Sequence, residues 1–156
     1  GELKADAGGV LVKGQSGLLT RFAGCCNPVP GDEIVGFVSR GRGVVIHRAD
    51  CPNVKNLEGE GEDRILPAEW AQTEGGRFVA GIVIKAKDQG VALSVLTSVV
   101  SEMRLMIVGV NSRFDKNKDA VIEANIRLNG KEDIDRLITK IRQDERIGEV
   151  FRTVTK

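Results

Sequence analysis

Short apolar stretches separated by turn residues dominate the first half of the chain. Four of them, at residues 10–13, 18–23, 34–38 and 44–47, are rich in β-branched side chains and too short for helices, so each predicts a β-strand. Segments rich in proline and glycine at residues 27–32 and 40–43 are typical of turns or exposed loops. An acidic, glycine-rich segment at 58–63 predicts a solvated loop, and a further strand is expected at 64–70. We therefore expect a small, mostly β module.

The second half of the chain follows a regular order of strand and helix patterns. Strands are predicted at residues 78–86, 106–113, 119–128 and 147–155, and apolar residues recur with helical spacing at 92–103 and 134–141. Two carboxylates at residues 131–133 lie where the helix dipole favours them. The order β-α-β-β-α-β is the ferredoxin-like arrangement. The predicted fold class is α+β, with domains at residues 1–74 and 75–156 joined through the aperiodic segment 72–76.

Composition and charge narrow the range of functions. The 156 residues carry 23 basic and 22 acidic side chains, so a formal charge of +1 gives the whole protein no attraction for nucleic acids or anionic membranes. No apolar run reaches the roughly 18 residues that a membrane span needs, and residues 1–4 lack the apolar core of a signal peptide. We expect a soluble, cytoplasmic protein without a membrane partner, in which any nucleic-acid contact comes from a local patch.

Such a patch is predicted at residues 40–55. It holds four basic residues, Arg40, Arg42, Arg48 and Lys55, against one acidic residue, whereas five acidic residues face one basic residue at 56–69. Arginines on a glycine-rich loop can approach phosphates closely and bind them bidentately. An ordinary solvated hairpin is the alternative. Because only 4% of residues are aromatic and tyrosine is absent, RNA shape and phosphate are the expected target rather than stacked bases.

The three cysteines are the main candidates for chemistry. An odd number argues against a disulfide framework. Cys25 and Cys26 are adjacent, and His47 and Cys51 follow with His-x-x-x-Cys spacing, so three thiols and one imidazole could complete a tetrahedral zinc site. Adjacent side chains on an extended strand point to opposite faces, so this site requires a bend near residues 27–28. Small buried thiols or a reactive Cys–His pair are the alternatives.

The motif around these cysteines resembles a known family. Residues 19–32, LTRFAGCCNPVPGD, continuing through IVG at 34–36 and GRGVVIHRADCPN at 41–53, closely resemble the conserved-cysteine module of the Rel/SpoT family. Its members are the long bifunctional (p)ppGpp synthetase/hydrolases of the bacterial stringent response. In that family the module, called zinc-finger or ribosome-intersubunit domain, is followed by an ACT domain with the β-α-β-β-α-β order predicted above. The resemblance covers essentially the whole chain.

The resemblance implies a non-catalytic C-terminal regulatory region, a fragment without the hydrolase and synthetase domains. It further implies contact with ribosomal RNA and the A-site tRNA, and restraint of the catalytic domains of the parent enzyme. The expected ribosome-contacting residues are those of the basic patch: Arg40, Arg42, Arg48 and Lys55.

The resemblance also implies an amino-acid site in the ACT half. ACT domains typically bind amino acids near the turn before the first helix, often where two copies pair, because a glycine there lets a carboxylate reach backbone N–H groups. The candidate residues lie in that turn and on the next strand: Gln89, Gly90, Val91, Ala92, Ile107, Gly109 and Asn111. Their neighbours Met106, Val108 and Val110 are expected to pack under the helices.

The turn departs from the common Asp-Arg-x-Gly pattern followed by two leucines. Lys87 and Asp88 occupy the first two positions, and the smaller Val91 and Ala92 replace the leucines, which favours a branched-chain amino acid as effector. A structural ACT domain that uses its sheet to form a homodimer or to dock is the alternative.

Two other functions fit the sequence. The chain could be the ACT-regulated tail of an amino-acid biosynthetic enzyme, with a purely structural cysteine module. It could instead be a thiol-redox or Cys–His catalytic module, which requires Cys25 or Cys26 to be exposed with a low pKa.

Overall fold

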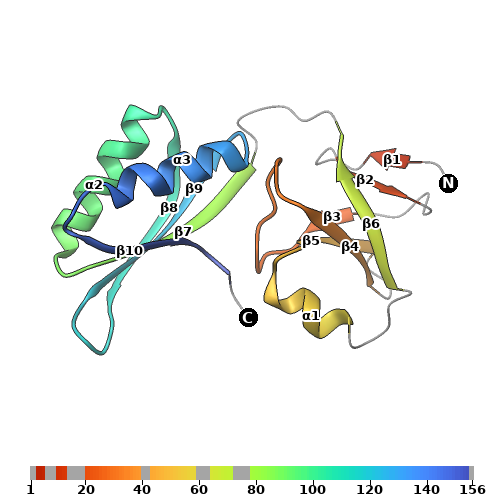
Figure 1. The fold of residues 1–156 in the computed structure, drawn as a ribbon, viewed down its shortest axis with the longest axis horizontal. Coiled ribbons are helices and arrows are strands. Elements are labelled where there is room, and N and C mark those ends of the chain that lie inside the picture. Colours follow the sequence, from red (N-terminus) through yellow and green to blue (C-terminus); the bar gives the residue numbers. More distant parts are fainter. Residues whose placement is uncertain are drawn as a thin grey trace. The chain divides into compact units, whose positions relative to one another are not determined.

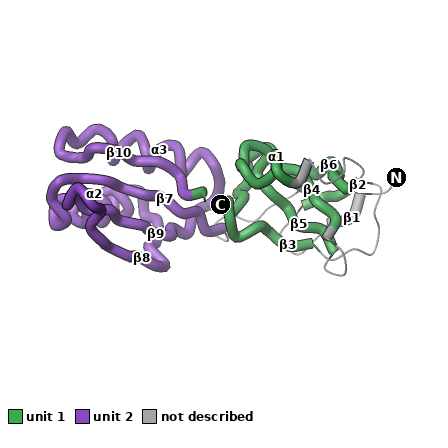
Figure 2. The backbone as a smooth tube through the Cα atoms, turned by 90° about the horizontal axis from the view of Figure 1, so that it is seen from below, with its two compact units in different colours: residues 1–74, 154–156 green, residues 75–153 purple. Residues whose placement is uncertain are grey.

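The structure is a computed structural model of the chain that describes residues 3–5, 10–13, 20–39, 43–58, 64–71 and 78–154. The chain divides into two compact units, residues 1–74 with 154–156 and residues 75–153 (Figure 2). Each unit has its own sheet. None of the helices in the described ranges is long and apolar enough to cross a membrane.

The first unit is a six-stranded sheet with the strand order β1-β2-β6-β4-β5-β3 (Figure 1). Neighbouring strands are antiparallel except β3 and β5, which are parallel. The elements are β1 (Leu3–Ala5), β2 (Val10–Lys13), β3 (Thr20–Phe22), β4 (Ile34–Ser39), β5 (Gly43–Arg48), α1 (Pro52–Glu58) and β6 (Ile65–Trp70). The prediction of a mostly β module is confirmed.

Strand β5 is buried on both faces, and this divides the core of the first unit in two. Val44 and Ile46 belong to a cluster with Val10, Val12 and Ile34. Val45, between them on the strand, packs on the other face with Ala23, Val54 and two of the cysteines. The second cluster therefore joins the cysteines to α1 and fixes them on the sheet.

Two elements of the first unit were not predicted. Strand β1 has only three residues, and α1 begins at Pro52, where we expected no helix. Proline suits the first position of a helix, because its fixed φ is already helical and its missing N–H has no partner there. The seven residues of α1 are too few to show a periodic pattern. The helix depends instead on its packing through Val54, which is buried against the cysteines.

The second unit confirms the predicted ferredoxin-like order. Its sheet has the order β10-β7-β9-β8 with all neighbours antiparallel, and α2 and α3 cover one face (Figure 1). The buried stripes of the two helices supply its core on that face. The elements are β7 (Phe78–Ala86), α2 (Gln89–Glu102), β8 (Met106–Phe114), β9 (Ala120–Leu128), α3 (Lys131–Arg142) and β10 (Ile147–Arg152).

A β-bulge in β8 overturns the expectation of strict alternation along this strand. The register shifts between Ile107 and Gly109. Ile107 pairs with the buried Ile126, on the face that the helices cover, whereas Gly109 pairs with the exposed Asn125 on the open face. Because a bulge places one extra residue on one strand, side chains beyond it change face. Ile107 therefore lies on a different face of the sheet from Gly109 and Asn111, although the three were predicted to belong to one amino-acid site.

The expectation that the neighbours of these residues pack under the helices was also wrong. The side chains of Met106, Val108 and Val110 are 55%, 42% and 54% exposed. Strand β8 lies at the edge of the sheet, and an edge strand has a neighbouring strand on one side alone. Apolar residues on it are thus covered less than the pattern predicts.

Candidate metal centre

The two adjacent cysteines lie in a turn that follows β3. The backbone N–H of Asn27 donates to the carbonyl of Ala23 at 3.0 Å, and Asn27 has a φ of 44°. This turn supplies the bend that the sequence requires. Cys25 and Cys26 are therefore not on an extended strand, and both sulfurs reach the same imidazole: they lie 3.5 and 3.9 Å from Nδ1 of His47.

The other two candidate ligands come from the segment that joins β5 to α1. His47 is on β5, and Cys51 directly precedes α1, with its N–H donating to the carbonyl of Arg48 at 3.0 Å. The carbonyl of Cys51 in turn accepts from the N–H of Val54 at 3.0 Å. Strand β3, strand β5 and helix α1 thus converge at one cluster.

The distances within the cluster fit a zinc tetrahedron. All four ligand atoms lie within 4.8 Å of one another, and the sulfurs of Cys25 and Cys51 are 3.6 Å apart. Zinc–sulfur and zinc–nitrogen bonds of ordinary length give tetrahedral edges of about 3.8 Å between sulfurs and about 3.6 Å between sulfur and nitrogen. The sulfur–nitrogen distance of 3.5 Å from Cys25 matches the second value, whereas the 3.9 Å from Cys26 is longer than it. The four side chains could therefore hold zinc with little rearrangement.

Burial shifts the pKa values of Cys26 and His47 in the cluster. It raises the pKa of the Cys26 thiol to about 12, although the N–H of Arg48 donates to this sulfur and favours the thiolate. Burial, with the nearby charge of Arg21, lowers the pKa of His47, which keeps the imidazole neutral as a metal ligand requires. A buried thiol with a raised pKa is a poor nucleophile. Cys26 therefore lacks the low pKa that a reactive Cys–His pair requires of it.

Arg48 differs from its predicted role at an RNA surface. It is 6% exposed, and its Nε and Nη2 donate to the carboxylate of Asp50 at 2.9 and 3.0 Å. Its Nη1 donates to the carbonyl of Cys26 at 3.3 Å, and its backbone N–H donates to the sulfur of Cys26 at the same distance. These bonds hold the cysteine turn against β5. Sequence reasoning missed this role, for which the Arg-x-Asp spacing was the available signal.

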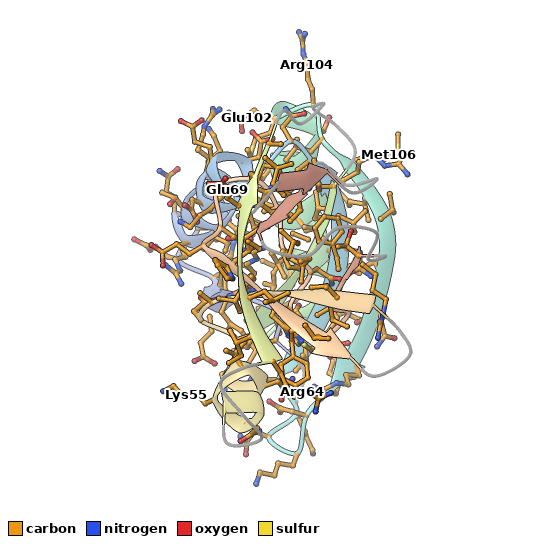
Figure 3. The ribbon with its side chains drawn as sticks, turned by 90° about the vertical axis from the view of Figure 1, so that its right-hand side faces the viewer. Lys55, Arg64, Glu69, Glu102, Arg104 and Met106 are labelled. Carbon is orange, nitrogen blue, oxygen red and sulfur yellow. The ribbon has the colours of Figure 1, made fainter. Side chains whose placement is uncertain are left out.

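The other residues of the basic patch have different placements. Lys55 is exposed on α1 and projects away from the helix (Figure 3). Arg40 and Arg42 lie outside the described residues. Among the described residues of the patch, Lys55 is thus the one with an exposed side chain that can contact a partner.

The residues predicted to bind an amino acid separate into two groups. Gln89, Gly90, Val91 and Ala92 form the first turn of α2, and the carboxylate of Asp88 accepts from the N–H of Val91 at 3.0 Å. Asp88 thus already occupies a backbone donor that was expected to bind a ligand carboxylate. The Gln89 side chain donates to the hydroxyl of Ser112 and connects this turn to β8.

The second group lies on the open face of the sheet of the second unit. Gly109 and Asn111 line a cavity of about 260 Å³ together with Glu123, Asn125 and Thr153. The structure therefore brings Gly109 and Asn111 together and leaves Ile107 on the other face.

The fold and the cluster define a two-part class of protein: a cysteine–histidine module of β-strands followed by a ferredoxin-like domain. Residues 10–71 match the family model of the RelA/SpoT RIS domain, and residues 74–152 match that of an ACT domain. The chain belongs to the Rel/SpoT family, of which it comprises the RIS and ACT regions.

Named relatives agree with this assignment. The chain is 35% identical to a GTP pyrophosphokinase of Streptomyces coelicolor, over 94% of this chain and 17% of that protein. It is 34% identical to a GTP pyrophosphokinase of Escherichia coli K12, over 88% of this chain and 19% of that protein. It is 33% identical to the bifunctional (p)ppGpp synthase/hydrolase RelA of Mycobacterium tuberculosis, over 96% of this chain and 20% of that protein. The chain thus spans about a fifth of the length of these relatives.

A solved structure is also similar to the second unit. The solution structure of the ACT domain from a GTP pyrophosphokinase of Chlorobium tepidum is 22% identical and covers 51% of this chain and 89% of its own, with a TM-score of 0.43.

Proposed function

We propose that the chain is the non-catalytic regulatory region of a bifunctional (p)ppGpp synthetase/hydrolase, and that its cysteine module is a zinc-organised surface for the ribosome. The observation that carries this proposal is the cysteine–histidine cluster, whose distances fit zinc, within a module that matches the RelA/SpoT RIS domain. The A-site tRNA and the catalytic domains of the parent enzyme are the other partners we propose. The relatives named GTP pyrophosphokinase support such a parent.

Cys25, Cys26, His47 and Cys51 would hold the zinc. A zinc ion with four protein ligands stabilises a fold and leaves no open position for catalysis. Arg48, which donates to the sulfur of Cys26 and is itself held by Asp50, would orient that ligand. The metal would thereby fix α1, which carries Lys55, on the sheet next to β5.

Ribosome binding tests this proposal. The chain should pellet with ribosomes at low salt, and Arg40→Ala/Arg42→Ala should weaken binding, because arginines pair with backbone phosphates. Each lost phosphate contact should reduce the slope of log affinity against log salt by about 1. Lys131→Ala, at an exposed lysine of the ACT unit, is the matched control.

The outcome of the ribosome-binding assay distinguishes this proposal from the alternative, the ACT-regulated tail of a biosynthetic enzyme. Unchanged binding by the double variant would refute the assignment of the two arginines. A wild-type chain that stays in the supernatant while it binds an amino acid would instead favour the ACT-regulated tail of a biosynthetic enzyme.

We further propose that the ACT domain forms a homodimer through β8. The strand is nine residues long, lies at the edge of its sheet and exposes apolar side chains, of which Met106 projects away from the strand (Figure 3). Val110→Lys should shift the chain toward a monomer in sedimentation equilibrium. Phe151→Lys changes an exposed apolar residue on the opposite edge strand and should leave association unchanged. Equal association of both variants with wild type would exclude β8.

A branched-chain amino acid is the effector that we propose for the turn before α2. The hydrogen bond from Gln89 to Ser112 favours this position, because it connects the turn to the strand through which the copies would pair. Calorimetric titration with valine, isoleucine and leucine should give saturable heat for at least one of them. No heat and no thermal shift with any of the three would remove the sensing function.

A further inference from the structure

A cavity of about 480 Å³ opens beside the candidate metal centre, within the first unit. Its floor is one row across the sheet, in which Arg21 of β3 and Phe37 of β4 both pair with Val45 of β5. Asn53 and Asn56 of α1 line it from the helix, and Cys25 and His47 line it from the metal centre. The space is within the range of cavities that bind small organic groups, about 300 to 1,000 Å³.

The chemistry of the lining restricts what can bind. Arg21 is the one charged side chain among the described residues of the lining, so a cationic ligand is disfavoured and an anionic group has a partner. Asn53 and Asn56 are three residues apart on a helix and therefore lie on one side of it. Each carboxamide offers both a donor and an acceptor. Phe37 and Val45 provide an apolar surface between these polar groups.

This combination of one arginine, two carboxamides and an apolar floor fits a nucleotide. Proteins that read RNA bind unstacked bases in such sites, with the base on an apolar surface, its edge on polar side chains and its phosphate on a basic residue. A carboxamide matches the adenine edge, which presents the N6 donor beside the N7 acceptor. The same edge of guanine presents two acceptors, which suit arginine instead.

We propose that this cavity binds one unstacked adenine of ribosomal RNA. The base edge would bind the carboxamides of Asn53 and Asn56, and the adjoining phosphate would bind Arg21. The inference rests on the proposed ribosome contact and goes beyond it, because a base bound in a cavity adds a preference for one nucleotide to sequence-independent phosphate binding.

Gly24 allows the cavity to be filled without disturbing the module. It lines the cavity, it is exposed, and a Cβ at this position meets no atom within 4 Å. Gly24→Leu should therefore place its side chain in the space that the base needs. Asn56→Ala removes one carboxamide from an exposed position of α1. Asn117→Ala, which removes the same group from an exposed turn of the ACT unit, is the matched control.

The experiment measures ribosome affinity and chemical probing of ribosomal RNA together. Wild-type chain should change the ribose acylation of one unpaired adenine. Gly24→Leu and Asn56→Ala should lose this change and weaken binding by ~10-fold or more, since both a filled cavity and a lost base contact remove recognition. Asn117→Ala should behave as wild type. Zinc content and thermal unfolding identify a variant that is misfolded, and if Gly24→Leu loses zinc, Asn56→Ala decides.

The outcomes distinguish this inference from the proposed function. If both variants bind ribosomes as wild type does, with the same probing pattern, the cavity is not a base site and the ribosome contact stands. A change at a guanine or a pyrimidine in place of adenine overturns the adenine site as stated. If the wild-type chain does not bind ribosomes, the proposed function fails and this inference fails with it.

Discussion

Removal of the metal should destabilise the cysteine module and leave the stability of the ACT domain unchanged. The four candidate ligands come from the turn after β3, from β5 and from the start of α1, so the metal would join segments that are distant in the sequence. The ACT unit has its own core of buried helix and strand residues, to which the cluster does not belong. A chelator should therefore separate the two unfolding transitions.

The expected size of the effect follows from binding linkage. A ligand that binds the native state alone, at a free concentration of about 1,000 times its Kd, stabilises that state by about 4 kcal/mol. For a unit of 77 residues (1–74 with 154–156), each 1 kcal/mol shifts Tm by about 4–8 °C. Chelation should thus lower the Tm of the first unit by about 15–30 °C.

Differential scanning calorimetry of the full chain, with and without a strong zinc chelator, measures both transitions. Cys51→Ser should reproduce the chelated state, because Cys51 is buried and is one of the four candidate ligands. Ala23→Ser is the matched control, since it adds a hydroxyl at a buried neighbouring position and retains every ligand. A shift below about 2 °C on chelation, together with protein that contains well under one zinc per chain, would refute the metal centre and favour small buried thiols.

Three further effects follow from particular contacts. Gly81→Ala should lower the free energy of unfolding by about 1–3 kcal/mol in urea denaturation, because its Cβ would lie 2.8 Å from Oγ1 of Thr153. Gly109→Ala should be tolerated, since the nearest atom to its Cβ would be 3.6 Å away. Hydrogen bonds from Arg146 lower the pKa of Asp144 to about 2. The Asp144 carboxylate therefore stabilises the fold at a pH above its ordinary pKa, and this contribution is lost as the pH falls through about 2. In Asp144→Asn, thermal stability should depend less on pH over that acid range. Arg48→Ala should weaken zinc binding, measured by competition with a chelating dye, by about 10–100-fold, and an unchanged affinity would show that its hydrogen bond to the ligand sulfur is dispensable.

The ACT fold could be predicted because burial in this half follows the periodicity of the chain. Residues 120, 122, 124, 126 and 128 alternate toward the helices, and they are buried as the pattern indicates. The bulge in β8 could not be predicted, because one extra residue on an edge strand leaves no mark in the hydrophobic pattern. The error at Ile107 follows from this bulge. The exposure of Val110, which pairs with the buried Ala124, follows from the edge position of β8.

The cysteine module was predicted less completely because tertiary contacts decide its geometry. Adjacent cysteines would diverge on a strand, and the turn that joins them to His47 depends on Asn27 at a positive φ and on the hydrogen bonds of Arg48. A charge pattern shows that Arg48 is basic, but not that its side chain is buried and pairs with the exposed Asp50. The residue types were thus sufficient to predict the cluster, whereas the buried position of Arg48 could be seen only in the structure.

Two of the candidate metal ligands also line the proposed base cavity, and this would make the two sites interdependent. Cys25 and His47 belong to the cluster and to the cavity wall, and α1, which supplies the two asparagines, packs on the cysteines through Val54. Metal binding that fixes this wall would favour the base, and linkage requires RNA to tighten metal binding by the same factor. Ribosome-bound chain should therefore retain its zinc at a higher chelator concentration than free chain at equilibrium, and equal retention would show that the two sites act independently.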